Sequence, residues 1–344
     1  MRKIAVAVTA LCVLAIGAMP ARAATTDPYY AKQWGLHNIG AERAWSVSRG
    51  AGATIAVIDT GVDRSHPDLG SNVVFANGAN VTCSTGGKGN GKRKSKCDPN
   101  NPSDDHGHGT HVAGIAAALT DNGVGVAGTA PSARILAVKA LDSSGSGGID
   151  DIAAGIRFAA DRSDVINLSL GELPGVHFIP GINDPIDSAL EYAWSRGVTI
   201  VAAAGNDGAP LCSYPAAYAR VICVGAVDRF DLKTFYSNFG AGIGVVAPGG
   251  VGSVFCDDDN DIWSTYPLSR DTTCTRSQGY ETLAGTSMAT PFVAGVAALL
   301  SAQGLTNQQI VDRLRTTSDD LGSPGYDPVY GYGRINAARA VGAA

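Results

Sequence analysis

The arrangement of apolar segments constrains the fold of this chain more than any other feature of its sequence. Short runs rich in Val, Ile and Ala alternate with longer stretches of small residues at helical spacing. The runs predict buried strands at 54–58, 134–140, 165–170, 198–203, 221–227 and 243–247, and the stretches predict helices at 111–119, 149–160, 186–196 and 287–303. Strands this apolar must be buried on both faces of the sheet by other elements of the protein. The sequence therefore predicts an α/β fold of three layers, with a mostly parallel central sheet and helices on both faces.

Composition narrows the class of protein. The chain has 344 residues, of which 45% are hydrophobic and 17% charged, and this profile excludes global disorder. A formal net charge of −5 gives no general attraction to nucleic acid or anionic lipid, so we expect neither as a partner. The one basic stretch, residues 86–96, is rich in Gly and Lys and reads as a solvated loop. Residues 24–344 contain no evident linker, so we expect one large domain there.

The first 23 residues have the pattern of a secretory signal peptide. Arg2 and Lys3 precede an apolar run at 4–18, and Ala21 and Ala23 occupy the two positions that a signal peptidase reads. The competing interpretation is a membrane anchor, but the run is shorter than the roughly 20 residues a spanning helix needs. We therefore expect cleavage near Ala23 and export to the periplasm or the extracellular space.

The cysteine content agrees with export. Of the 7 cysteines, all but Cys12 follow the signal peptide. Six cysteines allow fifteen pairings, and sequence alone does not choose among them. They fall into three local couples in loop-like sequence, so we favour three disulfides over free thiols or a zinc site: Cys83 with Cys97, Cys212 with Cys223, and Cys256 with Cys274.

Four polar residues lie where open α/β sheets build their sites, at strand ends and helix starts. Asp59 ends a predicted strand, Asn206 follows another, and His108 and Ser287 lie near the starts of two predicted helices. Each alone reads as a turn or capping residue. Together they supply a nucleophile, a general base, a carboxylate that orients the base, and a donor for an oxyanion.

The segments around these four residues resemble the subtilisin-like serine proteases, the subtilase family, and are most similar to its thermitase branch. They read AVIDTGVD around Asp59, HGTHVAG around His108, AAAGND around Asn206 and GTSMATP around Ser287. The resemblance implies a subtilisin-like fold and an exported serine endopeptidase that acts on proteins or peptides, as a monomer. It makes Asp59 the orienting carboxylate, His108 the base, Ser287 the nucleophile and Asn206 an oxyanion donor.

Three alternative interpretations compete with this one. A protein of this fold that has lost catalysis would serve as a binding module, although its usual sign, a missing site residue, is not found here. An esterase would carry Gly-x-Ser-x-Gly, whereas the context of Ser287 is Gly-Thr-Ser-Met-Ala. Three nearby histidines, at 106, 108 and 111, also suggest a metal cluster, but that would leave the Ser287 and Asn206 segments unexplained.

The resemblance also implies two edges that pair with the substrate backbone, and a first specificity pocket. The implied residues are Ser144, Gly145, Gly147, Ser169, Leu170, Gly171 and Glu172. Glu172 departs from the family, which usually has a second glycine there. At the pocket mouth its carboxylate would favour a basic residue before the scissile bond; the alternative is a solvated side chain. His106 would border the second pocket.

A structural calcium ion is implied in the same way. Carboxylate, amide and carbonyl oxygens are the ligands that calcium prefers. The positions that match the family's strong site are the side chains of Asp27, Asp68 and Asn122 and the backbone oxygens of Leu119, Val124 and Val126. The alternative is an ordinary Gly-rich turn. A second acidic cluster, Asp257, Asp258, Asp259 and Asp261, could bind another calcium ion, but we favour its interpretation as a solvated loop.

The chain departs from the family in two further ways. Most relatives carry a pro-domain that assists folding, whereas Asp27 follows the expected cleavage at Ala23 after only a few residues. We therefore expect either unaided folding or a separate inhibitor or folding-assistant chain. Phe292 stands where the family usually has His, and we interpret it as a packing change.

Overall fold

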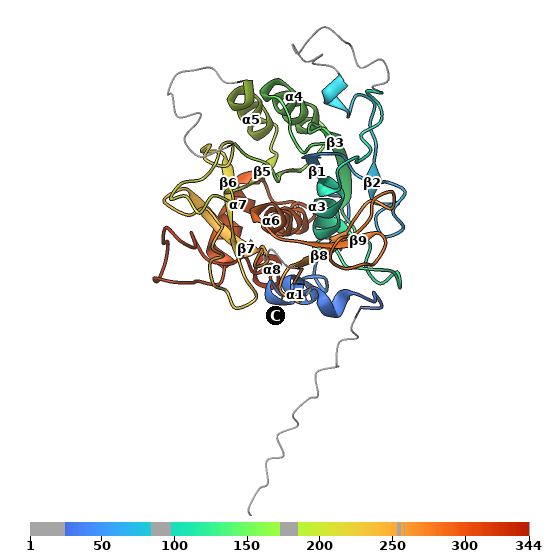
Figure 1. Cartoon of the computed structure of the whole chain (residues 1–344). Helices are drawn as coiled ribbons and strands as arrows, with labels where there is room; N and C mark the ends of the chain where they lie inside the picture. Colours follow the sequence, from blue (N-terminus) through green and yellow to red (C-terminus); the bar gives the residue numbers. More distant parts are fainter. Residues whose placement is uncertain (1–24, 84–97, 173–184, 253–255, 258, 344) are drawn as a thin grey trace, which may run out of the picture.

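The centre of the molecule is a 7-stranded sheet with the strand order β2-β3-β1-β4-β5-β6-β7 (Figure 1). The computed structural model describes residues 25–83, 98–172, 185–252, 256–257 and 259–343. All neighbouring strands in this sheet are parallel. They are β1 (Thr54–Asp59), β2 (Val73–Val74), β3 (Arg134–Lys139), β4 (Val165–Leu168), β5 (Thr199–Ala203), β6 (Val221–Val227) and β7 (Ile243–Pro248). The six strands predicted from the sequence are all present, with β2 added at one edge.

Helices cover both faces of this sheet, as predicted. Along β1, Ile55 and Val57 pack into the core that contains α3 and α6, whereas Ala56 and Ile58 pack into the core that contains α4 and α5. Figure 1 shows the two pairs of helices on opposite sides of the strands. Their bounds are α3 (His108–Ala117), α4 (Ile149–Ala160), α5 (Pro185–Ser195) and α6 (Thr286–Ser301). This alternation confirms the three-layer α/β architecture.

Shorter elements complete the chain. A separate antiparallel pair, β8 (Ile262–Thr265) and β9 (Tyr280–Leu283), packs against α3. Near the chain ends, the backbone N–H of Ala337 donates to the Ile39 carbonyl at 2.7 Å, so both ends of the described chain lie on the same side (Figure 1). The remaining elements are η1 (Tyr30–Lys32), η2 (Val81–Cys83), α1 (Trp34–Asn38), α2 (Ala41–Ala44), α7 (Asn307–Thr317) and α8 (Ala337–Val341).

Two of the predicted disulfides are present. Cys212 pairs with Cys223 and Cys256 pairs with Cys274, with Cα atoms 6.6 Å and 5.0 Å apart. The third prediction involves Cys97, which lies outside the described residues, as do the signal peptide at 1–23 and the basic stretch at 86–96. In the part of the chain that the structure describes, no helix has the length and apolar character to cross a membrane.

Candidate active site

Asp59 and His108 form a hydrogen-bonded pair at the carboxyl end of β1. His108 Nδ1 lies 2.8 and 2.9 Å from the two carboxylate oxygens of Asp59. The Asp59 side chain is fully buried, whereas the His108 side chain keeps 21% of its surface exposed. The Asp59 carboxylate therefore orients the imidazole ring through Nδ1, while part of the ring remains accessible to solvent.

The close approach of α3 to β1 depends on a glycine. A Cβ on Gly109 would lie 2.1 Å from the Gly61 carbonyl oxygen and 3.1 Å from Asp59 Cβ. The backbone N–H of Gly109 donates to Thr60 Oγ1 at 2.9 Å. Any larger residue at this position would push the start of α3, and His108 with it, away from Asp59.

Asp104 holds the turn that leads into α3, and sequence reasoning missed it. Its buried carboxylate accepts hydrogen bonds from the Thr60 hydroxyl, the N–H groups of His106, Gly107 and Thr110, and the Thr110 hydroxyl. A carboxylate placed before a helix satisfies the N–H groups that have no partner within the helix. The signal was available in the sequence, since an Asp four residues before the start of a small-residue helix has this pattern.

The pKa of His108 is raised above its ordinary value of 6.5. Burial alone would lower it, because burial disfavours the charged imidazolium. The negative charge of Asp59, the hydrogen bond that His108 donates to Asp59 and the charge of Asp104 outweigh that effect. The site therefore stabilises a proton on His108, which is a property that a general base would need.

Ser287 is the second residue of α6 and lies beside the segment that follows β4. Its hydroxyl donates to the Ser169 carbonyl at 3.2 Å, and the Ser169 hydroxyl donates to the Ser287 carbonyl at 2.8 Å. Among the described residues, no hydrogen bond joins Ser287 to His108. The structure therefore shows the serine hydroxyl turned toward Ser169.

Asn206 lies in the exposed turn after β5, next to the start of α6. Its side-chain oxygen accepts hydrogen bonds from the backbone N–H and the hydroxyl of Thr286, both at 2.9 Å. Because the side-chain oxygen is engaged in this way, the NH₂ group of Asn206 remains available as a donor. Thr286, which holds the oxygen, directly precedes Ser287 in α6. Thr286 therefore orients Asn206, a role that the sequence did not reveal.

His111 has no part in this arrangement. It is fully buried, and its Nε2 lies 3.1 Å from the carbonyl oxygens of both Ile262 and Glu281, to which it donates. Burial, with the charge of His108 as the second cause, lowers the pKa of His111 to about 3. A neutral His111 thus ties α3 to β8 and β9.

The predicted substrate edges flank the site on two sides. Gly145 comes close to His106, because a Cβ on Gly145 would lie 3.2 Å from His106 Nε2. Ser169 contacts Ser287 as described above, and Leu170 and Gly171 continue from it. The backbone N–H of Glu172 donates to the Tyr214 carbonyl at 3.0 Å. Residues 173–184 lie outside the described residues, so the pocket role of Glu172 stays a prediction.

The three side chains predicted to bind calcium meet at one loop. Buried Asp27 accepts from the N–H groups of Asp121 and Asn122, at 2.9 and 3.1 Å. Buried Asp68 accepts from Asn122 Nδ2 and from the Val126 N–H, both at 2.8 Å. Val124 and Leu119 join the same network through their N–H groups, to Asn122 Oδ1 and the Asp68 carbonyl.

The chemistry of this loop fits calcium. Burial is the largest cause that raises the pKa of both carboxyl groups, and it brings the pKa of Asp68 to about 7. The negative charge of Asp27 adds to the effect on Asp68. Two buried carboxylates and a side-chain amide oxygen are donors of the kind that a hard divalent cation prefers, and the positive charge of such a cation would offset the cost of burying the carboxylates.

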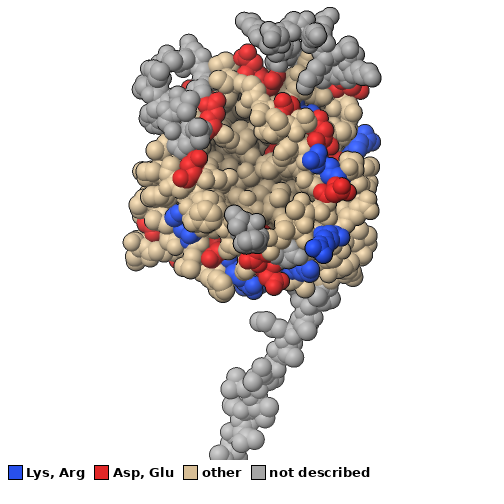
Figure 2. Space-filling view, viewed as in Figure 1, with Lys and Arg blue, Asp and Glu red and all other residues tan. Residues whose placement is uncertain are grey.

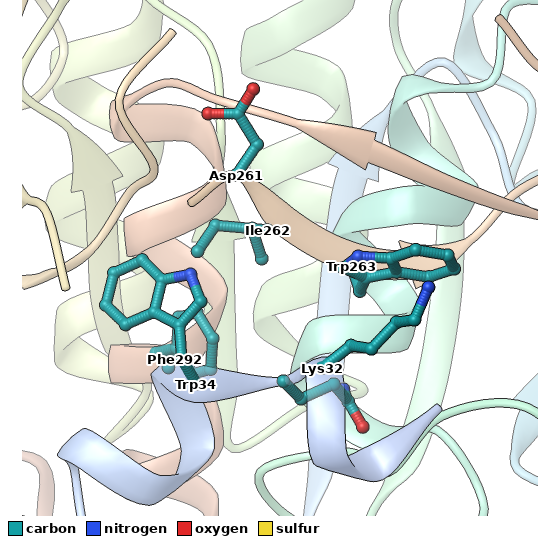
Figure 3. A pocket seen from close by; sticks show the side chains of 8 residues that line it. Lys32, Trp34, Asp261, Ile262, Trp263 and Phe292 are labelled. Carbon is teal, nitrogen blue, oxygen red and sulfur yellow. The ribbon is translucent and has the colours of Figure 1, made fainter. Parts of the chain in front are cut away.

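One pocket contains none of the candidate site residues. It lies between the start of α1, β8 and α6, and Figure 3 shows its side chains: Lys32, Trp34, Asp261, Ile262, Trp263 and Phe292. A Cβ on Gly35 would lie 2.7 Å from the Phe292 ring. Phe292 therefore fills space beneath α1, which agrees with its interpretation as a packing residue.

Comparison with known proteins gives a consistent result. Residues 50–333 match the model of the subtilase family. The chain is 41% identical to thermitase from Thermoactinomyces vulgaris over 92% of this chain and 98% of that protein. It is 43% identical to a thermophilic serine proteinase from Bacillus sp. (strain AK1), over 92% of this chain and 68% of the relative. Among solved structures, a protease from Pseudoalteromonas arctica PAMC 21717 superposes with a TM-score of 0.77 at 32% identity, over 93% of this chain and 99% of the other.

Proposed function

Because this chain belongs to the subtilase family and is a subtilisin-like serine endopeptidase, we propose that Asp59, His108 and Ser287 form its catalytic triad, with Asn206 in the oxyanion hole. The observation that carries the proposal is the pairing of His108 with a buried carboxylate at 2.8 Å, at the sheet edge where Ser287 and Asn206 also lie. The alternative, an inactive binding module, would have no need for this arrangement.

The geometry suggests a definite order of events. Ser287 turns from the Ser169 carbonyl toward His108, which takes its proton as the hydroxyl oxygen attacks the substrate carbonyl. Asp59 stabilises the imidazolium that forms. The side-chain NH₂ of Asn206 and the backbone N–H of Ser287 donate to the developing oxyanion. His108 then gives the proton to the leaving nitrogen, and a water molecule repeats the sequence on the acyl-enzyme.

Extended peptide chains are the substrates that this surface suits. Figure 2 shows a hollow in the middle of the viewed face, formed by uncharged side chains, with Lys and Arg interspersed among Asp and Glu around it. We infer that the acyl half of a peptide lies along Ser144, Gly145 and Gly147 on one side and Ser169, Leu170 and Gly171 on the other, with Glu172 at the first pocket. The mixed charge on this face gives a polyanion no continuous basic surface.

Two further parts of the proposal concern the setting of the enzyme. We infer that it is exported, because the pattern of residues 1–23 and the two disulfides both suit an oxidising compartment. We also infer that one calcium ion binds between Asp27, Asp68 and Asn122, together with backbone oxygens of Leu119, Val124 and Val126. When bound, calcium would supply positive charge that stabilises the folded loop, and it has no part in the chemical step.

The experiment that tests the function compares wild type with Ser287→Ala. Wild type should hydrolyse a protein substrate and react covalently with a fluorophosphonate probe, because His108 activates the hydroxyl. Ser287→Ala should lose both reactions and keep its far-UV circular dichroism spectrum and melting temperature. Wild-type protein that is folded yet inert toward both reagents would point to the binding-module alternative instead.

A further inference from the structure

The loop between β8 and β9, residues 266–279, is held in place from within. The backbone N–H of Tyr266 donates to the Gly279 carbonyl at 2.6 Å, and the Cys256–Cys274 disulfide ties the loop to the segment before β8. The side chain of Glu281, in a residue only 4% exposed, accepts from the backbone N–H groups of Thr273, Cys274 and Thr275. An exposed loop with this many internal bonds presents its side chains in fixed positions.

This loop packs on the segment that leads to His108. Arg270 Nη1 donates to the Asp105 carbonyl at 2.9 Å, and the Tyr266 hydroxyl lies 3.5 Å from the His106 carbonyl. A Cβ on Gly107 would lie 2.5 Å from the Tyr266 ring. The guanidinium of Arg270 is therefore anchored three residues before His108 in the chain.

The charge of Arg270 is not neutralised by the protein around it. Its side chain is exposed, and its one hydrogen bond goes to a backbone carbonyl. The neighbouring carboxylate, Asp105, pairs instead with Lys139 Nζ at 2.7 Å. Within the described part of the chain, Arg270 has no acidic partner, so a positive charge is fixed at the rim of the site and remains open to a ligand.

The position of the 266–279 loop indicates which half of a bound peptide would contact it. The His106 side chain faces Gly145, which belongs to the edge proposed for the acyl half. The loop instead contacts the backbone of 105–107, through Arg270 and Tyr266. Because His108 protonates the leaving nitrogen, the leaving half of the peptide begins beside His108 and extends away from the acyl-half edges.

We propose that Arg270 binds an acidic side chain in the leaving half of the peptide, so that the enzyme prefers Asp or Glu within the first three residues after the scissile bond. This inference rests on the proposed function and adds a substrate class to it. An accessible ion pair of this kind changes kcat/KM by about two- to fivefold, and the effect weakens as salt is added.

The test uses internally quenched peptides with one acyl half and with Glu, Lys or Ala placed in turn at each of the three positions after the scissile bond. Wild type should cleave the Glu peptide ~2- to 5-fold faster than the Lys peptide, in kcat/KM, at one of these positions. Arg270→Ala should abolish that ratio, Arg270→Glu should invert it, and Arg270→Lys should retain most of it.

The control is Arg162→Ala, because the Arg162 guanidinium also donates to a backbone carbonyl at 2.9 Å, but in the turn after α4. The Glu-to-Lys ratio of kcat/KM measured for Arg162→Ala should equal that of wild type. The same Glu-to-Lys ratio in wild type and Arg270→Glu at all three positions, with the peptides still cleaved, would overturn the inference alone. Peptides left uncut by a folded wild type that also ignores the fluorophosphonate probe would refute the proposed function, and the role of Arg270 with it.

Discussion

Two carboxylates, Asp59 and Asp104, act on the protonation of His108. Asp59 contacts the ring directly, whereas Asp104 acts through its charge and through the turn that it organises. The sequence predicted the first residue from its place after a strand. It did not predict the second, because the available signal, an Asp four residues before a helix start, is a local pattern that many turn residues share.

The acid limb of the pH profile follows from these charges. In the proposed mechanism neutral His108 is the base, and its pKa is raised, so kcat/KM should fall as the pH drops through a value above 6.5. In Asp104→Asn one raising charge is lost, and the midpoint of this limb should move to lower pH. The measurement is kcat/KM for both proteins between about pH 5 and 9. A midpoint that is the same in both would show that the charge of Asp104 does not reach His108.

The proposed oxyanion donor, Asn206, should depend on Thr286, which orients it. Asn206→Ala should reduce kcat by about 10²- to 10³-fold with a small effect on KM, a size that is the known cost of removing this type of donor in subtilisin. Thr286→Val removes the hydroxyl but keeps the backbone N–H that also holds Asn206, so kcat should fall by only about fivefold, the equivalent of one hydrogen bond. A larger loss in Thr286→Val than in Asn206→Ala would mean that Thr286 acts on something other than Asn206.

At the level of whole elements, the parallel strands were predictable and several helices and the hairpin were not. The six apolar runs became strands because each is buried on both faces and continuous in apolar character. The helix predicted at 111–119 begins instead at His108 and ends at Ala117. Gly107 and Gly109 weaken the helical pattern of the sequence there. The Asp104 carboxylate stabilises the observed start of α3 by accepting hydrogen bonds from backbone N–H groups.

The pair β8 and β9 escaped prediction for a different reason. Each strand is four residues long, and between them lie polar loop residues with no turn signal of a tight hairpin. Their pairing depends on contacts from elsewhere, including the Nε2 of His111 on the carbonyls of Ile262 and Glu281. The helix α7 has only three buried apolar residues, so its pattern was too weak to register.

The contact between α3 and β1 can be tested at Gly109. Gly109→Ala places a methyl group against the Gly61 carbonyl, and the overpacking should destabilise the fold by ~1–3 kcal/mol. It should also displace His108 from Asp59, so kcat/KM should fall even at temperatures where the variant is folded. Differential scanning calorimetry and peptide hydrolysis check the two effects. Gly148→Ala is the control for glycine loss itself, since φ there is −79° and a Cβ would meet no atom closer than 3.4 Å. A Gly109→Ala enzyme as active and as stable as wild type would refute the close approach.

The whole molecule brings together segments that are far apart in the chain. The site combines the ends of β1, β4 and β5 with the starts of α3 and α6, and the proposed calcium loop joins residue 27 to residues 68 and 119–126. Sequence spacing alone cannot place these segments side by side. The resemblance to a known family predicted the assembly, and the buried, hydrogen-bonded carboxylates give it a physical basis in this chain.

Removal of calcium should therefore destabilise the whole domain. A ligand that binds only the folded state stabilises it by mass action, so at about 100 times its Kd calcium should raise the melting temperature by roughly 5 °C. Excess EGTA should remove this gain. Asp68→Asn should make the melting temperature insensitive to calcium, whereas Asp257→Asn, in the other acidic cluster, should leave the response intact. A melting temperature of the wild type that is the same with calcium and with EGTA would exclude a structural site of this kind.

The hydrogen bond from Ser287 to the Ser169 carbonyl has a consequence for kinetics. Rotation of an accessible side chain takes pico- to nanoseconds, whereas enzymes of ordinary speed turn over in about a millisecond to a second. The attacking rotamer is therefore in rapid pre-equilibrium with the resting one. Because one hydrogen bond separates them, the attacking fraction is lowered by about fivefold, and that fraction multiplies the rate of acylation. A substrate backbone that takes over the Ser169 carbonyl would release the hydroxyl as it binds, so that the nucleophile becomes available only when there is a peptide to attack.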